Sequence, residues 1–181
     1  LHDKRRRQRQ MCIRDRYKAN RSDAPDDLIP QFDYIRKSVE AFNLPSIELI
    51  NYEADDLIAT YSEQIIKKGG DVTIVSSDKD LMQLYKKNIR IYDPMTNKFI
   101  NEEDIKKKFG VKAEKVIDVQ SLAGDSSDNV PGVPGIGIKT AAELINEYGT
   151  LENLLSNSKN IKQNKRRETL IENKQKAMIS K

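Results

Sequence analysis

Gly124–Ile145 reads GDSSDNVPGVPGIGIKTAAELI and combines carboxylates with a turn rich in proline and glycine. Asp125 and Asp128 lie in a loop that opens on a glycine, and the run Pro131–Gly137 follows directly. Proline fixes φ and glycine permits positive φ, so this run can expose consecutive backbone N–H groups at the start of the next helix. Such groups bind anions such as phosphate. The stretch therefore indicates an element that holds a nucleic-acid backbone beside carboxylates, which bring metal ions.

The composition is typical of a water-soluble chain with one substantial core and room for a small second lobe. The chain has 181 residues, of which 33% are charged. No apolar run approaches membrane-spanning length and the first residues are basic rather than apolar, so we expect neither a membrane segment nor a secretory signal. The single Cys12 cannot form an internal disulfide, which fits a reducing, cytoplasmic compartment.

The net charge of +4 is not an argument for nucleic-acid binding, because it comes from the first residues. Residues 1–16 hold seven Lys or Arg and two Asp, a net charge of +5, which leaves −1 for the remainder. This segment has no hydrophobic period and no turn chemistry, and we interpret it as a foreign leader. A genuine basic arm for nucleic acid is the alternative.

Hydrophobic periodicity and turn residues predict an α/β part followed by a helical part. The expected elements are a helix over 28–42, a strand over 47–50, a helix from about Glu53 to Lys68, a buried strand over 71–75, a short helix over 81–86, a hairpin of 89–92 and 98–100, helices over 101–110, 116–122, 138–148 and 151–155, and a long C-terminal helix.

Alternating strands and helices predict a mostly parallel sheet with crossover helices. The composition shifts near residue 119. The expected organisation is therefore a tail over 1–16, an α/β lobe over 17–118 and a helical lobe over 119–181.

Three acidic clusters fall where the predicted elements end. They are Glu53, Asp55 and Asp56 at a helix start, Asp78 and Asp80 after the buried strand, and Asp125 and Asp128 before the glycine-rich turn. Open α/β sheets bind ligands outside the carboxyl ends of their strands, so these clusters are expected to converge. Two carboxylates 4 Å apart repel by about 4 kcal/mol at an effective dielectric near 20, so converging acids need cations. Oxygen ligands without His or Cys favour Mg²⁺ or Mn²⁺, and a pair of such ions can hydrolyse a phosphodiester.

Each feature also has a structural interpretation. Acids at a helix start complement the helix dipole, and acids in loops cap helices or form turns. The run Pro131–Gly137 can be a plain helix connector. A basic cluster near the C-terminus is either a solvated helix face or a DNA contact, and it consists of Lys162, Lys165, Arg166 and Arg167. The joint occurrence of three acidic clusters and the turn favours a site over these separate explanations.

Four motifs resemble, in order, the 5′→3′ exonuclease domain of bacterial DNA polymerase I, a member of the flap-endonuclease family. They are YKANR from Tyr17, YEADD from Tyr52, SDKD from Ser77 and the Gly124 stretch quoted above. The resemblance covers about 90% of the chain, from Tyr17 to Lys181. It implies a PIN-like α/β lobe with a helix-hairpin-helix lobe, which cuts 5′ flaps and 5′ ends of duplex DNA with two Mg²⁺ ions.

The resemblance also implies roles for individual residues. The seven acids above match metal-binding acids of the family, with Asp55 the weakest candidate for a direct ligand. Lys18 and Arg21 match basic residues that steer and polarise the scissile phosphate. The hairpin that grips duplex DNA, where family members also bind K⁺, is matched by Gly132, Gly135, Gly137 and Lys139. The implied protein is a bacterial, cytoplasmic monomer whose full-length chain can include a polymerase domain.

This sequence departs from the family at its start. The family begins with a buried strand and further helices that supply two more metal-binding aspartates, whereas here an arginine-rich segment precedes Tyr17. Asp3 and Asp15 lie in no strand-like context and receive no such role. We therefore expect a sheet without its first strand and a fragment with weak or no nuclease activity. The rival functions are a non-catalytic, structure-specific DNA-binding module, an RNA-directed PIN-type nuclease and a structural protein.

Overall fold

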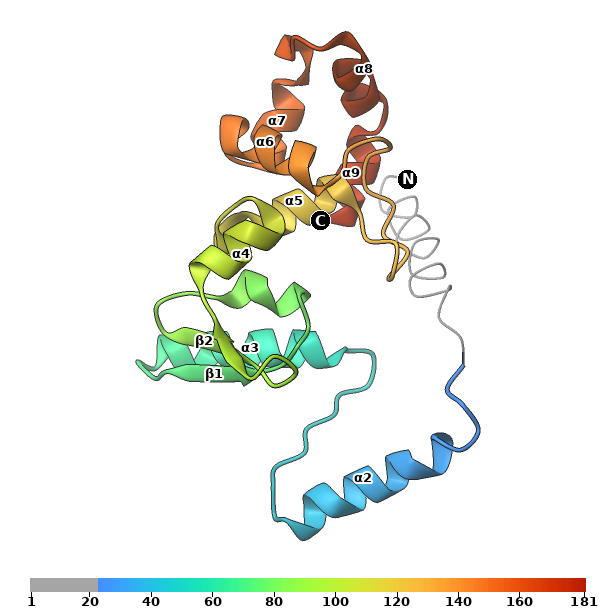
Figure 1. The fold of residues 1–181 in the computed structure, drawn as a ribbon, viewed down its shortest axis with the longest axis vertical. Coiled ribbons are helices and arrows are strands. Elements are labelled where there is room, and N and C mark those ends of the chain that lie inside the picture. Colours follow the sequence, from blue (N-terminus) through green and yellow to red (C-terminus); the bar gives the residue numbers. More distant parts are fainter. Residues whose placement is uncertain (1–22) are drawn as a thin grey trace, which may run out of the picture.

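The computed structural model describes residues 23–181, and its sheet has three strands (Figure 1). β1 (Val72–Val75) pairs in parallel with β2 (Ile89–Asp93), which pairs antiparallel with β3 (Lys98–Ile100). Asp93 closes the β2–β3 hairpin, because its carboxylate accepts hydrogen bonds from the N–H groups of Met95 and Thr96. The predicted strand over 71–75 and the edge hairpin are thereby confirmed, but the strand is not buried throughout, because Ile74 alone is buried and Val75 is 64% exposed.

α3 (Ala54–Lys67) packs against β1, and the other helices continue the described chain beyond the sheet. The helices are α2 (Ile29–Ala41), α3, α4 (Glu102–Phe109), α5 (Val116–Ala123), α6 (Ile138–Tyr148), α7 (Leu151–Ser156), α8 (Asn164–Glu172) and α9 (Lys174–Ser180), with 3₁₀ turns η1 (Asp80–Leu84), η2 (Ala113–Lys115) and η3 (Ser158–Asn160). The sequence explains several of the ends. Asn101 caps α4 by accepting the N–H of Asp104 at 2.9 Å, and Gly110 ends it in the left-handed conformation.

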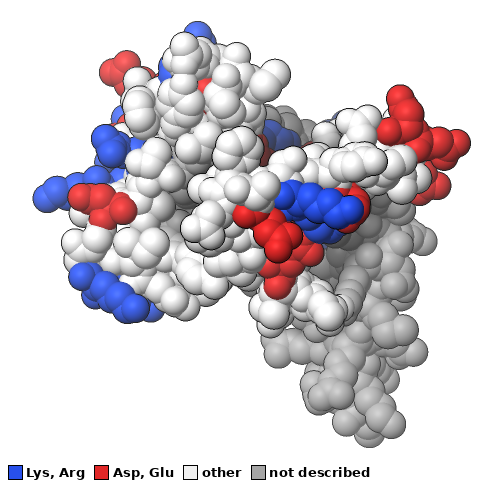
Figure 2. Space-filling model, turned by 90° about the horizontal axis from the view of Figure 1, so that it is seen from below, with Lys and Arg blue, Asp and Glu red and all other residues white. Residues whose placement is uncertain are grey.

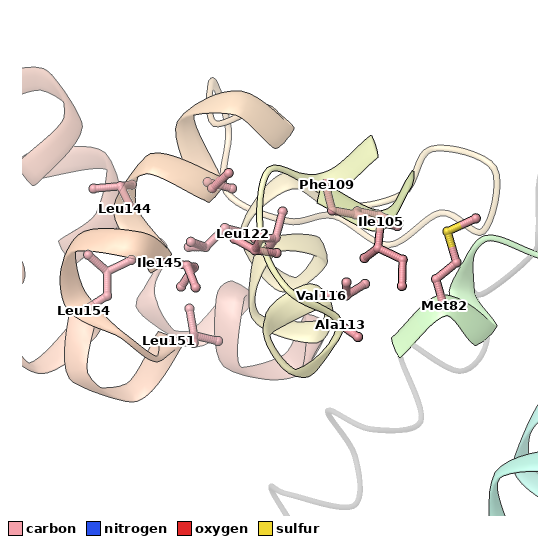
Figure 3. Packing of buried hydrophobic residues seen from close by; sticks show 14 of the residues in the cluster. Met82, Ile105, Phe109, Ala113, Val116, Leu122, Leu144, Ile145, Leu151 and Leu154 are labelled. Atoms are coloured by element: carbon pink, nitrogen blue, oxygen red, sulfur yellow. The ribbon is translucent and has the colours of Figure 1, made fainter. Parts of the chain in front are cut away.

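One connected apolar core joins the sheet to the helices (Figure 3). It runs from Met82 in η1 through Ile105 and Phe109 of α4 to Leu122 of α5, and on to Ile145 of α6. α5 contacts η1 and η2 on one side and α6, α7 and α9 on the other. Because the same core continues along α5, the loops at the two ends of this helix are held at set positions relative to each other.

Three predicted elements differ from the structure. Residues 47–50 form no strand; a strand needs a hydrogen-bonded neighbour, and the described chain places none beside this segment. The short helix expected over 81–86 is the 3₁₀ turn η1. The long C-terminal helix is divided into α8 and α9 at Asn173, whose side chain donates a hydrogen bond to the carbonyl oxygen of Thr169 at 2.9 Å.

α2 forms where the periodicity predicts it, but none of its residues is buried by the described chain. Phe32 and Ile35 on its apolar face are 43% and 55% exposed. Figure 1 shows α2 (blue) apart from the sheet, at the far end of an extended connection. Its amphipathic pattern therefore predicted the helix correctly without showing what it packs against. No helix in residues 23–181 is long and apolar enough to cross a bilayer.

An ion-pair network fixes the C-terminal helix to the core. The ammonium group of Lys181 lies 2.7 Å from the carboxylate of Asp118 in α5 and 2.7 Å from that of Glu152 in α7. Asp118 is only 6% exposed, so its charge needs a partner inside the fold. Lys181 provides this partner and holds α9 against α5.

We expect Lys181→Met to destabilise the fold by about 2 kcal/mol, because it leaves the buried Asp118 carboxylate without its cation. The measurement is urea unfolding followed by circular dichroism. Lys174→Met, on the exposed first residue of α9, the helix that ends just before Lys181, is the matched control and should change stability by less than about 0.5 kcal/mol. Equal effects of the two substitutions would contradict the role of Lys181.

The same network predicts a pH dependence. The pKa of Glu152 is lowered, chiefly by the hydrogen bond from Lys181. A lowered carboxyl pKa contributes stability that is complete above the group's ordinary pKa and is lost as the pH falls through the folded-state value. The difference in unfolding free energy between the wild type and Glu152→Gln should therefore be largest at neutral pH and disappear in acid. A difference that grows on acidification would show that Lys181 does not stabilise the carboxylate.

Candidate metal and nucleic-acid site

Acidic side chains from three separate segments line one pocket of about 390 Å³. The start of α3, the turn η1 and the loop after α5 supply them: Glu53, Asp55, Asp56, Asp80, Asp125 and Asp128. Gln83, Gln120, Ser180 and Lys181 add polar groups to the lining. The structure thus brings together six of the seven predicted acids. Asp78, the seventh, does not line the pocket.

The acids at the start of α3 also stabilise that helix. The backbone N–H of Glu53 donates to the carboxylate of Asp56 at 3.0 Å, and the Glu53 side chain accepts the N–H of Asp56 in return. This reciprocal arrangement is a capping box, which satisfies N–H groups that the first turn leaves unpaired. The acids at the start of α3 therefore do two things: they cap the helix and they line the pocket.

The two acids after β1 have different surroundings. The carboxylate of Asp78 accepts the backbone N–H of Asp80 at 2.9 Å and so shapes the turn into η1. The carboxylate of Asp80 accepts a hydrogen bond from the side-chain amide of Gln120 in α5 at 2.5 Å. Gln120 of α5 therefore holds the side chain of Asp80 at the pocket. Asp78 instead stabilises the turn that places Asp80 there.

The loop after α5 is closed by its own backbone and by two glycines. Asp125 and Val130 exchange backbone hydrogen bonds of 2.9 and 2.7 Å. Gly124 and Gly132 have positive φ, and a Cβ on Gly132 would lie 2.4 Å from the backbone nitrogen of Gly124. Only glycine fits such an approach of two backbone segments. This packing fixes the loop that carries Asp125 and Asp128 to the pocket.

Asp125 forms an ion pair with Lys79, which lies between Asp78 and Asp80 in the sequence. The other oxygen of Asp125 accepts the N–H of Ser127 at 2.8 Å. Burial acts to raise the pKa of Asp125, but the hydrogen bonds from Lys79 and Ser127 outweigh it, so the pKa is lowered. Burial likewise acts to lower the pKa of Lys79, and the carboxylates of Asp125, Asp80 and Asp128 raise it overall. Both groups are therefore charged at neutral pH.

The chemistry of the lining fits a hard divalent cation, since its acidic ligands are carboxylates and it contains neither His nor Cys. The arrangement is not a closed coordination shell, because within residues 23–181 no three acidic, His or Cys side chains stand as a ready metal-binding group. Asp80 and Asp125 instead bond to Gln120 and Lys79. These carboxylates would have to exchange protein partners for an ion.

The glycine-rich turn leads into the N-terminus of α6, where the sequence predicts a phosphate-binding element. Gly135 and Gly137 are exposed, with open space where a Cβ would lie, and Gly137 is the N-cap residue. No acidic residue occupies the first turn of α6, and Lys139 there is exposed. These features keep the N–H end of the helix accessible to an anion. Gly132 is buried and serves the loop packing described above.

Charge of one sign does not dominate the face of the molecule that Figure 2 shows. On the face shown in Figure 2, acidic and basic side chains lie beside one another. In the C-terminal basic cluster, Arg167 bonds the carbonyl oxygen of Ile161 at 3.1 Å and the side chain of Asn164 at 2.8 Å. Arg167 therefore has a structural role, whereas Lys162 and Lys165 are exposed. The features that indicate a nucleic-acid interface are therefore the glycine-rich turn and the acidic pocket, and not the net charge of the chain.

Two predicted residues, Lys18 and Arg21, lie outside the described part of the chain. Conversely, the structure adds residues of the pocket lining, and Lys79 next to that lining, that the sequence reasoning missed. Lys79 belongs to the SDKD motif, and its position between two acids was the feature of the sequence that could have indicated an ion pair. Gln120, Ser180 and Lys181 carry no recognisable pattern, because only the packing of α5 and α9 brings them to the pocket.

Comparison with family models decides the ancestry of the chain. Residues 1–110 match the model of the 5′–3′ exonuclease N-terminal resolvase-like domain, and residues 111–181 match that of the 5′–3′ exonuclease C-terminal SAM fold. The chain belongs to the 5′–3′ exonuclease family. The resemblance seen in its motifs is thereby confirmed.

Curated relatives of this exonuclease-family chain are bacterial. DNA polymerase I of Rhizobium leguminosarum is 57% identical over 166 residues, which are 92% of this chain and 16% of that protein. A 5′–3′ exonuclease of Aquifex aeolicus is 43% identical over 141 residues, 78% of this chain and 49% of that protein. The chain thus spans about half, or much less, of the length of these relatives.

Solved structures show the same fold at low sequence identity. The T5 5′-exonuclease with bound divalent zinc ions has a TM-score of 0.82 at 22% identity, over 94% of this chain and 67% of that one. A T5 flap endonuclease in a pseudo-enzyme-product complex with DNA and metal ions has a TM-score of 0.81 at 22% identity, over 94% of this chain and 67% of that one. The predicted fold class, an α/β lobe with a helical lobe, is therefore confirmed.

The loop that carries Asp125 should depend on the glycine packing. We expect Gly132→Ala to cost about 3 kcal/mol, because it adds left-handed strain and a clash with the backbone of Gly124. Gly135→Ala is the matched control: its φ is also positive, but its Cβ would meet open space, so about 1 kcal/mol is expected. Thermal or urea unfolding measures both. Similar losses at the two positions would argue against close packing at Gly132.

Proposed function

We propose that this chain is the nuclease part of a DNA polymerase I-type protein and hydrolyses DNA phosphodiesters at 5′ ends and 5′ flaps in replication and repair. The observation that supports the proposal is the convergence of acids from three distant segments on one pocket, followed along the chain by an accessible helix N-terminus. A related fold has been solved with DNA and metal ions together, which supports the same pairing of ligands here. A polymerase domain in the full-length chain, a monomeric state and a bacterial cytoplasmic setting belong to the same proposal.

The proposed cofactors are two Mg²⁺ or Mn²⁺ ions, held by the acids of the pocket together with Asp78. When bound, such ions activate water and stabilise the leaving oxygen of the phosphodiester. Asp80 and Asp125 come from different segments of the chain, and Gln120 orients Asp80. Lys18 and Arg21 are proposed to contact the scissile phosphate, where a cation stabilises the charge that develops on its oxygens.

The proposed grip on duplex DNA uses the turn and the start of α6. Gly135 and Gly137 allow close approach of a phosphate, and Lys139 adds a positive charge on the first turn. Gly132 contributes by shaping the loop. We propose further that a K⁺ ion binds main-chain carbonyls of this turn. Contacts of this kind are independent of base sequence.

The cleavage assay uses a labelled 5′-flap DNA with Mg²⁺ or with a chelator. We expect cleavage to require Mg²⁺ and to fall about 100-fold in Asp125→Asn, because one preorganised charge at the reacting phosphate is lost. Asp33→Asn, on the exposed Asp33 of α2, is the control and should leave the rate unchanged. Cleavage that survives the chelator would overturn the metal-dependent mechanism.

The same assay decides how active this chain is. Because the described acids do not form a closed ligand set, we propose slow cleavage by the 181-residue chain. DNA binding that ignores both Mg²⁺ and the acids, with no cleavage at any enzyme concentration, would favour the alternative of a non-catalytic, structure-specific DNA-binding module. Preference for RNA in a competition would favour an RNA-directed nuclease instead.

Binding to duplex DNA tests the turn separately from catalysis. Lys139→Ala should weaken binding equally for unrelated sequences and reduce the slope of log K against log salt concentration by about 1. Fluorescence anisotropy of a labelled duplex measures both quantities. Lys159→Ala, on the exposed Lys159 of η3, is the matched control. An unchanged slope in Lys139→Ala would place the phosphate contact elsewhere.

A further inference from the structure

Lys79 connects two of the segments that supply acids to the pocket, the turn before Asp80 and the loop of Asp125. Its ammonium group pairs with the carboxylate of Asp125, 46 residues further along the chain. The pair joins the turn after β1 to the loop after α5. The side chain of Lys79 is 36% exposed and that of Asp125 only 11%, so the contact is partly buried. An ion pair so placed is screened less by salt than one on the surface.

The surroundings of Lys79 are acidic on several sides. Asp80 and Asp128 also attract its charge, and both line the pocket. The lysine therefore compensates part of the repulsion that converging carboxylates create. Among the described residues that line the pocket, the one cationic side chain is Lys181, which is paired with Asp118 and Glu152. Lys79 is thus the cation placed at the Asp125 side of the site.

Both oxygens of Asp125 have protein partners, Ser127 on one and Lys79 on the other. The N–H of Ser127 is neutral and can share its oxygen with a metal ion. A divalent ion next to the ammonium group of Lys79 would be repelled, by several kcal/mol at 4 Å and an effective dielectric near 20. Binding of an ion to Asp125 therefore competes directly with Lys79.

We propose that Lys79 is an internal counter-ion that holds Asp125 when no divalent cation is bound and leaves it when one binds. The proposal rests on the metal-dependent function proposed above and adds a positioning residue to it. Lys79 holds the loop after α5 close to the turn after β1, and it lowers the affinity of the pocket for a divalent cation. It need not touch the substrate.

Manganese binding tests this competition without reference to catalysis. Free and bound Mn²⁺ are measured by electron paramagnetic resonance in the wild type, Lys79→Met and Lys79→Arg. We expect Lys79→Met to bind Mn²⁺ about tenfold more tightly, because the competing charge is gone, and Lys79→Arg to stay within about threefold of the wild type. Asp125→Asn should bind more weakly than the wild type.

Thermal unfolding gives the second readout. In a chelator, Lys79→Met should melt below the wild type, and saturating Mn²⁺ should raise its melting temperature by more than it raises that of the wild type. The control is Lys86→Met, because Lys86 forms a half-exposed ion pair with Glu63 that lies away from the pocket lining. Lys86→Met should leave the Mn²⁺ affinity unchanged. Lys79→Gln, which is polar and uncharged, repeats the experiment if Lys79→Met does not fold.

The outcomes separate this inference from the proposed function. Mn²⁺ affinity that is unchanged or weaker in both uncharged Lys79 variants, while the wild type binds Mn²⁺ and Asp125→Asn does not, would overturn the counter-ion role and leave the metal site intact. No saturable Mn²⁺ binding in the wild type would overturn the metal-dependent function and this inference with it.

Discussion

Mutual repulsion of carboxylates is the constraint that shapes this molecule. Acids from α3, η1 and the loop after α5 line one pocket, and their charges have to be compensated within the fold. The described chain meets this need with neighbouring donors: Lys79 for Asp125, Gln120 for Asp80 and the reciprocal backbone bonds of Glu53 and Asp56. The candidate site is therefore stabilised by groups that an entering cation would have to replace.

The apolar core makes this convergence possible. α5 packs between the sheet side and the C-terminal helices, so the residues that precede and follow it are held on one rigid element. Gln120 lies on that helix and Asp125 follows its end, which gives both a set distance from η1. The loop carrying Asp125 then depends on the close approach of Gly124 and Gly132. The apolar core and the contact between the two glycines thus determine where the carboxylates come together.

α2 and the segment after it show where the sequence pattern was insufficient. The periodicity of α2 predicts its helix, because local hydrogen bonds form any helix once the residues favour it. Residues 47–50 have an equally apolar pattern, but a strand exists only with a partner, and the described chain has none there. Ile50 is 86% exposed as a result. The helix of α2 could be predicted because its hydrogen bonds are local. Whether residues 47–50 find a partner strand could not be predicted.

The elements with local causes could be predicted from the residues alone: the capped helices, the strand over 71–75, the glycine and proline turn and the positions of the acids along the chain. The sequence motifs also determined the family, which the comparisons confirm. Three findings needed the folded chain: Asp78 supports a turn outside the pocket lining, Gly132 is a packing residue, and Lys79 pairs with Asp125. Such facts depend on contacts between residues far apart in sequence. No local spacing encodes which side chain will face which across a folded core.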